Sequence, residues 1–265
     1  MLRADASDTG CYTFAVMIPA VDIVYIAEEL ERVAEQLMAA GEDDGDASQA
    51  DPESLISASR GLLDELRRET SIGSAEIQQP AGIYRSARDP SALGNHCIGL
   101  LGQLAAVAGR LRQPQLAKQI EELALPLACW VSRRGGELNE LGPVVNGAAA
   151  LANNLKQPSM LAQLYGLLRE VCTAVSPQVS QETSSPDPTR PWRVLLLNQA
   201  IVATRSHQPV LMEEAFELLT ENMPEEAPEF FREGMEQMDA LAYPASVRRI
   251  MERFYDQWCG QRILH

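Results

Sequence analysis

Ala203-Thr204-Arg205-Ser206-His207-Gln208-Pro209 is the last of three stretches in which an alanine-containing helical run ends and a Gln-Pro pair begins the next amphipathic run. The other two are Ala108-Gly109-Arg110-Leu111-Arg112-Gln113-Pro114 and Ala152-Asn153-Asn154-Leu155-Lys156-Gln157-Pro158. Their prolines lie 44 and then 51 residues apart, which is a loose internal repeat of helical hairpins. Stacked hairpins form curved surfaces that usually bind other molecules. The sequence therefore predicts an all-α fold of irregular helical-hairpin repeats, stacked as an α-α superhelix or bundle.

Helical spacing of apolar residues, with Pro or Asp-Pro at the starts, gives the expected helices. They cover 19–41, 51–68, 89–112, 114–132, 138–155, 158–175, 191–206, 209–222, 227–241 and 244–259. Residues 12–18 read as a short strand or a packed tail. We expect a helical N-terminal segment over 1–70 with an acidic linker at 41–51, hairpin repeats over 89–176, a linker over 176–191 and C-terminal hairpins over 190–265.

The last expected helix carries an apolar stripe that should pack against the helix before it. The stripe consists of Val247, Ile250, Met251, Phe254 and Trp258, and its partners would be Phe230, Phe231, Met235, Met238 and Leu241.

The net charge of the chain limits the classes of partner that we expect. The chain of 265 residues has a formal net charge of -15, so nucleic acid and anionic membranes are not expected partners. Residues 1–60 carry a net charge of -10 and residues 210–240 a net charge of -9, which leaves +4 for the rest. Two acidic regions therefore flank a mildly basic middle, and a partner protein with a basic surface would suit them. Ordinary solubility charge is the alternative interpretation.

Five dispersed cysteines, at 11, 97, 129, 172 and 259, contain no close pair. We read them as buried apolar residues in a reduced, cytoplasmic protein. The apolar run from Cys11 to Ile26 is interrupted by Pro19 and Asp22, so it fits neither a signal peptide nor a membrane span.

The sequence lacks the residue types, at the required spacings, of known catalytic, cofactor-binding and metal-binding motifs. The acidic run at 42–46 lacks the glycine and glutamate of a calcium loop when counted from Asp44. His96 and Cys97 are neighbours that point apart on a helix, and Ser206-His207 lacks a nucleophile elbow. Gly135-Gly136 is not followed by the Lys-Ser/Thr of a phosphate loop. We therefore expect no metal, no cofactor and no catalytic residues.

Two features suggest a site for a partner. Trp192 lies between Arg190 and Arg193 at a helix start, and these residue types often dominate interfaces. The alternative is that Trp192 fills a groove between hairpins while the arginines stay in water. An acidic stripe follows Pro209 and consists of Glu213, Glu214, Glu217 and Glu221. A solvated helix face is its simpler interpretation.

These observations favour a non-enzymatic interaction protein, either a scaffold or an assembly factor (chaperone) for another protein. The alternative is an enzyme or small-molecule binder that holds an anionic ligand between hairpins with Arg190, Arg193 and His207.

Overall fold

The computed structural model describes residues 18–42, 54–61, 63–64, 67–68, 89–181 and 190–260. Within these residues the protein is predominantly helical and contains no strand, which confirms the all-α prediction. Residues 54–61, 63–64 and 67–68 are helical but carry no label. The labelled helices are α1 (Ile23–Glu42), α3 (Pro90–Arg110), α4 (Pro114–Glu122), α5 (Ala124–Arg133), α6 (Gly142–Asn154), α7 (Pro158–Ala174), α8 (Pro177–Gln181), α9 (Pro191–Arg205), α10 (Pro209–Asn222), α11 (Ala227–Ala240) and α12 (Ala245–Cys259).

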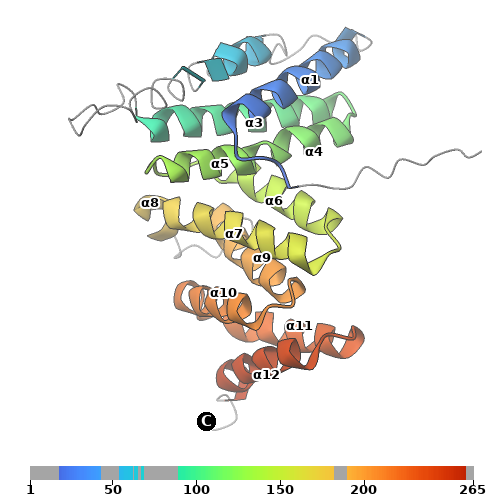
Figure 1. Ribbon diagram of the computed structural model, residues 1–265, viewed down its shortest axis with the longest axis vertical. Coiled ribbons are helices and arrows are strands. Elements are labelled where there is room, and N and C mark those ends of the chain that lie inside the picture. The colour runs from blue at the N-terminus through green and yellow to red at the C-terminus, as the bar shows by residue number, and fades with distance from the viewer. Residues whose placement is uncertain are drawn as a thin grey trace, which may run out of the picture.

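The helices follow one another along the long axis of the molecule, with α1 at one end and α12 at the other (Figure 1). α3 packs on α4, α5 and α6, and then α5 packs on α7 and α7 on α9. Beyond that point α9 packs on α10, α10 on α12, and α12 on α11. Buried apolar side chains form one continuous cluster from Ile23 to Phe254, so the three expected segments share a core.

Proline starts most of these helices. At α3, Asp89 adds a side-chain cap, because its carboxylate accepts a hydrogen bond of 2.9 Å from the Ser91 amide. The glutamines of the Gln-Pro pairs make no side-chain cap at α4, α7 or α10. The local signal therefore lies in the proline, whose fixed φ suits the first turn.

Two of the three Gln-Pro corners share a backbone conformation. Arg112 and His207 have φ of 57° and 58°, the left-handed conformation that commonly ends a helix. At the first corner the Gln113 amide donates to the Ala108 carbonyl at 2.8 Å, which is the long hydrogen bond of a Schellman motif. The second corner differs, because α6 ends at Leu155 in an extended conformation. The repeat in sequence is thus only partly a repeat in geometry.

The helix predicted over 114–132 is two helices, α4 and α5, which meet at Leu123. Pro126 explains the break, since it lacks an N–H and its ring clashes with the carbonyl four residues earlier in a continuous helix.

The helix predicted over 138–155 begins only at Gly142, because residues 137–141 are held in a non-helical connection. The Asn95 side chain donates to the carbonyls of Ser91 and Glu137 and accepts from the amides of Asn139 and Glu140. Leu138 also exchanges backbone hydrogen bonds with residues 174 and 176, which forms an isolated bridge to Val175.

The described residues cover only part of each predicted linker. Pro177–Gln181, expected within a linker, forms the short helix α8, while 182–189 lie outside the described residues. Residues 41–42 end α1, but 43–51 and the ambiguous segment 12–17 also lie outside the description.

Among the described helices, α3 alone is long and apolar enough to cross a membrane by length and composition, and half of its apolar stretch is buried. Such burial is also what a core helix shows.

The C-terminal helix packs as the sequence predicted for its central residues. Val247, Met251 and Phe254 are buried, and α12 packs extensively on α11. Phe254 contacts the rings of Phe216 and Phe231, with centroids 5.2 and 5.4 Å away. Leu241 is the exception: it is 51% exposed, because the chain leaves α11 at this residue.

Candidate functional site

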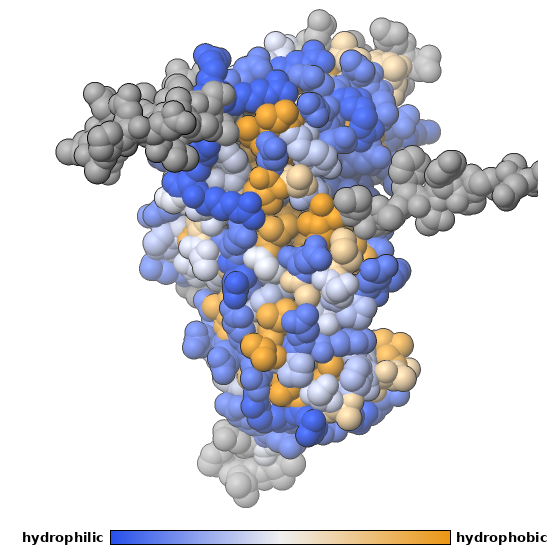
Figure 2. Space-filling view, in the orientation of Figure 1, coloured by the Kyte–Doolittle hydropathy of each residue, from blue (hydrophilic) through white to orange (hydrophobic). Residues whose placement is uncertain are grey.

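A largely apolar groove lies between α9 and α11, where the regular packing of successive helices is interrupted. It encloses about 420 Å³. The face of the molecule in Figure 2 carries apolar patches among polar side chains over its lower half, where α9–α12 lie. The lining residues are Leu197, Ile201, Thr204, Arg205, Phe230, Glu233, Gly234, Gln237, Met238, Leu241, Tyr243 and Met251. We call this the α9–α11 groove.

Helical spacing sets the length of the groove. Leu197, Ile201 and Arg205 follow one another at intervals of four on α9, so the α9 wall extends over roughly 12 Å. Ile201 is 44% exposed, although large apolar side chains are normally buried. Gly234 contributes to the α11 wall, and a Cβ there would lie 2.6 Å from the Met251 sulfur.

The two ends of the groove differ in character. One turn before Leu197, Arg193 forms an ion pair with Glu226, which joins the start of α9 to the start of α11. At the other end the groove meets a second pocket, since Arg205, Leu241 and Tyr243 line both. The groove is therefore bridged by an ion pair at one end and basic at the other.

The second pocket encloses about 240 Å³ and brings together three connections between helices. Lys156, Pro158 and Leu161 come from the α6–α7 corner, Arg205 and His207 from the α9–α10 corner, and Leu241, Ala242 and Tyr243 from the α11–α12 connection. We call it the corner pocket. Three of its eight side chains are basic and none is acidic.

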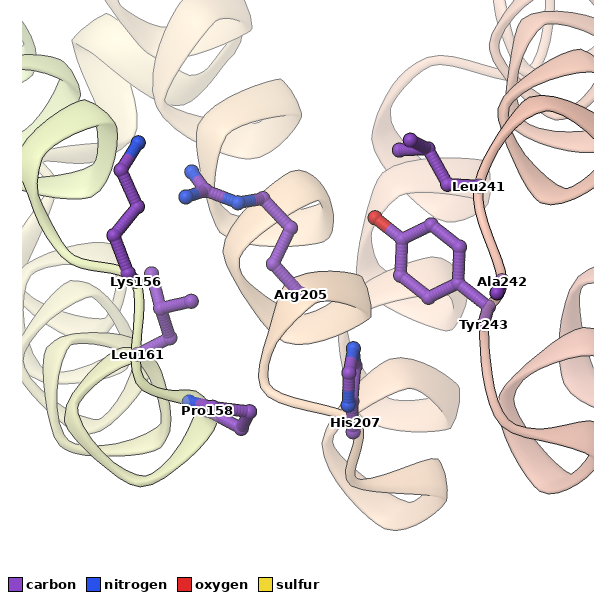
Figure 3. A pocket seen from close by; sticks show the side chains of 8 residues that line it. All are labelled: Lys156, Pro158, Leu161, Arg205, His207, Leu241, Ala242 and Tyr243. Atoms are coloured by element: carbon purple, nitrogen blue, oxygen red, sulfur yellow. The ribbon is translucent and has the colours of Figure 1, made fainter.

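The polar groups of the corner pocket are placed by contacts of their own (Figure 3). The Arg205 guanidinium donates to the carbonyls of Ala152 and Leu155 at 2.8 and 2.9 Å, which satisfies the C-terminal end of α6. Lys156 Nζ donates to the Asn153 carbonyl at 3.0 Å. The His207 ring meets the Tyr243 ring edge to face, with centroids 5.4 Å apart.

The arginines expected to hold an anion with His207 lie far from it. Arg190 precedes the first turn of α9, and His207 follows the last turn of this 15-residue helix, so roughly 22 Å separates them. Arg193 is paired with Glu226. Trp192, for which the sequence left open an interface anchor or a side chain that fills a groove between hairpins, is only 8% exposed and lies in the core, on the buried face of α9.

The acidic stripe on α10 is partly neutralised by neighbouring helices. Glu213 pairs with Arg253 at 2.8 Å and Glu214 with Arg169 at 3.4 Å. Glu217 and Glu221 are exposed and form no ion pair with the described part of the chain.

Burial, together with the nearby Glu214 carboxylate, raises the pKa of the Tyr165 phenol above its usual range.

Chemical groups for catalysis do not gather at either site. In the described ranges, no three His, Cys, Asp or Glu side chains come together in a way that would hold a metal. The cysteines described are unpaired: Cys97, Cys129, Cys172 and Cys259. Burial raises the pKa of the Cys97 and Cys129 thiols to about 12, so both are protonated at neutral pH.

Sequence reasoning found His207 but missed its neighbours. Lys156 and Arg205 belong to the second and third Gln-Pro stretches, but the sequence pattern does not show that these two stretches meet in space. Ile201 and Leu241 carried no signal, because apolar residues at helical spacing look alike whether they face a core or a groove.

No protein-family model matches the chain, and searches of curated proteins and of solved structures find no match either.

Proposed function

We propose that this protein is a non-enzymatic interaction protein, a scaffold or assembly factor, built from stacked helical hairpins in the manner of an α-α superhelix. The α9–α11 groove is the observation that carries the proposal. It presents exposed apolar side chains, Ile201 and Leu241 among them, between two helices that would otherwise be expected to pack together. Such a surface supports binding to another protein.

The chemistry of the groove suggests an amphipathic helix as its occupant. The α9 wall extends over roughly two helical turns, with Leu197 and Ile201 as its apolar part, which suits a partner stripe at i, i+3, i+4 and i+7. Glu233 lies in the α11 wall, and Glu229 and Glu236 stand one turn away on either side and are exposed. Residues 210–240 carry a net charge of -9, so basic residues beside the partner's apolar stripe would be attracted.

The acidic stripe on α10 takes a lesser place in this proposal. Glu217 and Glu221 would add to the negative field that guides a basic partner, while Glu213 and Glu214 stabilise helix packing. Neither nucleic acid nor membrane is part of the proposal. The unpaired thiols of the described cysteines support our proposal of a cytoplasmic location.

Isoleucine-methyl NMR with an amphipathic helical peptide as the probe tests this function. The peptide carries leucines on one face and arginines on the other, and a charge-reversed peptide carries glutamates in place of the arginines. We expect the basic peptide to shift the Ile201 methyl resonance in a saturable way and the acidic peptide to bind more weakly. Glu233→Arg should weaken binding of the basic peptide by about twofold to fivefold, the range of one exposed ion pair.

Glu217→Arg is the matched control, because it makes the same charge change on α10 away from the groove. If Glu217→Arg weakened binding as much as Glu233→Arg, net charge rather than the groove would be responsible. If neither peptide moved the Ile201 methyl signal, the groove would not be a helix-binding surface.

A further inference from the structure

The corner pocket is a basic site in an acidic protein, and the α9–α11 groove does not explain it. The formal net charge is -15, yet Lys156, Arg205 and His207 meet here without an acidic side chain in the lining. Within the described ranges, neither Lys156 nor Arg205 forms an ion pair with a carboxylate. Among the described residues, the polar groups that contact these two charges are backbone carbonyls at the end of α6.

The donors retain capacity for a ligand. A guanidinium has five N–H groups, and Arg205 uses two of them on Ala152 and Leu155, which leaves three. An ammonium has three, and Lys156 uses one on Asn153. Imidazole keeps at least one N–H in either protonation state. The ring contact with Tyr243 and the left-handed backbone of His207 hold this imidazole at the pocket.

The donors come from three different connections between helices. In Figure 3 the charged ends of Lys156 and Arg205 lie toward one side of the pocket and point away from His207, which stands below Arg205, and the Tyr243 hydroxyl points toward the Arg205 side chain. A tetrahedral oxyanion offers oxygens in several directions, whereas a carboxylate offers two in one plane. Charge-assisted hydrogen bonds to such an anion are among the stronger polar contacts.

We propose that the corner pocket binds a phosphate group, with Lys156, Arg205 and His207 as its ligands and the Tyr243 hydroxyl as a further donor. Pro158, at the first position of α7, places the positive end of that helix dipole beside the pocket. The inference does not depend on a partner in the α9–α11 groove, because the groove is tested with a helical peptide and the corner pocket with phosphate.

Phosphate titration monitored by 31P NMR, in a buffer without other oxyanions, tests the proposal. Inorganic phosphate and methyl phosphate are the probes, and acetate is the planar comparison. Lys156→Gln and His207→Gln should each weaken phosphate binding by about twofold to fivefold, and the double variant should remove saturable binding. The chain has only one other lysine, Lys118 on α4, so Lys118→Gln is a matched control that should bind like the wild type.

Saturable binding that Lys156→Gln and His207→Gln weaken and Lys118→Gln does not would support the site. Tighter binding of methyl phosphate than of inorganic phosphate would further support a pocket that prefers a phosphate monoester to the free ion. Absence of saturable binding, an equal effect of Lys118→Gln, or acetate binding as tightly as phosphate would each overturn the proposal. Melting temperatures of all variants separate a lost site from a lost fold.

Discussion

Phe254→Ala should destabilise the protein strongly, because this ring is buried in the C-terminal aromatic cluster of Phe216, Phe230, Phe231 and Phe254. Phe254 is 5% exposed and lies against the rings of Phe216 and Phe231. Truncation of a buried phenylalanine to alanine costs roughly 3–5 kcal/mol, compared with about 5–15 kcal/mol for the total stability of a typical protein. For a chain of this size, roughly 2–4 °C per kcal/mol converts this cost to a fall in melting temperature of about 6–20 °C.

Differential scanning calorimetry measures the fall, and two variants calibrate it. Phe254→Leu keeps much of the buried volume, so we expect it to fall between the wild type and Phe254→Ala. Glu217→Ala removes an exposed side chain without an ion pair in the described structure, and its effect should stay within about 0.5 kcal/mol. Hydrogen exchange should show α11 and α12 losing protection before α5–α7, since the cluster lies at one end of the stack.

A fall in melting temperature smaller than about 2 °C for Phe254→Ala would refute the reasoning. The ring would then contribute little to the core, and α12 would be held by its remaining contacts.

Three further changes test other parts of the fold. Gly147→Ala should cost about 1–3 kcal/mol in chemical denaturation, because the added Cβ would lie 2.2 Å from the Glu121 carbonyl oxygen; an unchanged midpoint would contradict the close α4–α6 approach. Arg112→Gly should stabilise the protein by up to about 1 kcal/mol, since glycine adopts its left-handed φ of 57° without strain. Cys97 and Cys129 should resist a thiol reagent at pH 8 until the protein unfolds, as peptide mass mapping would show; rapid labelling would mean that their burial is incomplete.

Most helices were predictable because proline marks their starts, and the next Gln-Pro pair, a glycine or an asparagine marks several of their ends. The errors arose where a residue was compatible with two different local structures. Pro126 lies within an apolar run that otherwise continues the helical period, and its effect on the helix was missed. Leu138 and Leu141 fit a helical stripe, but hydrogen bonds from residues 137–140 to Asn95 and to residues 174–176 keep this connection out of the helix. Contacts between distant residues overrode the local pattern.

The candidate site was less predictable than the fold. Trp192 combines the composition of an interface anchor with that of a core residue, and only its burial distinguishes them. Lys156 and Arg205 are 49 residues apart and meet because the α6–α7 and α9–α10 connections line the same pocket. The packing of helices that are distant in sequence therefore determines the site, and a single-sequence pattern does not specify that packing.

Asn95 has a consequence for which connections of this protein tolerate a change in length. The Asn95 side-chain amide uses both of its N–H donors, and its oxygen accepts twice. Three of these hydrogen bonds hold residues 137, 139 and 140 in fixed register, while Leu138 pairs with the backbone of residues 174 and 176. One inserted residue between Gly136 and Leu141 would shift that register and leave amide groups without partners. The α5–α6 connection is therefore a place where insertions should be rejected, although surface connections usually accept them.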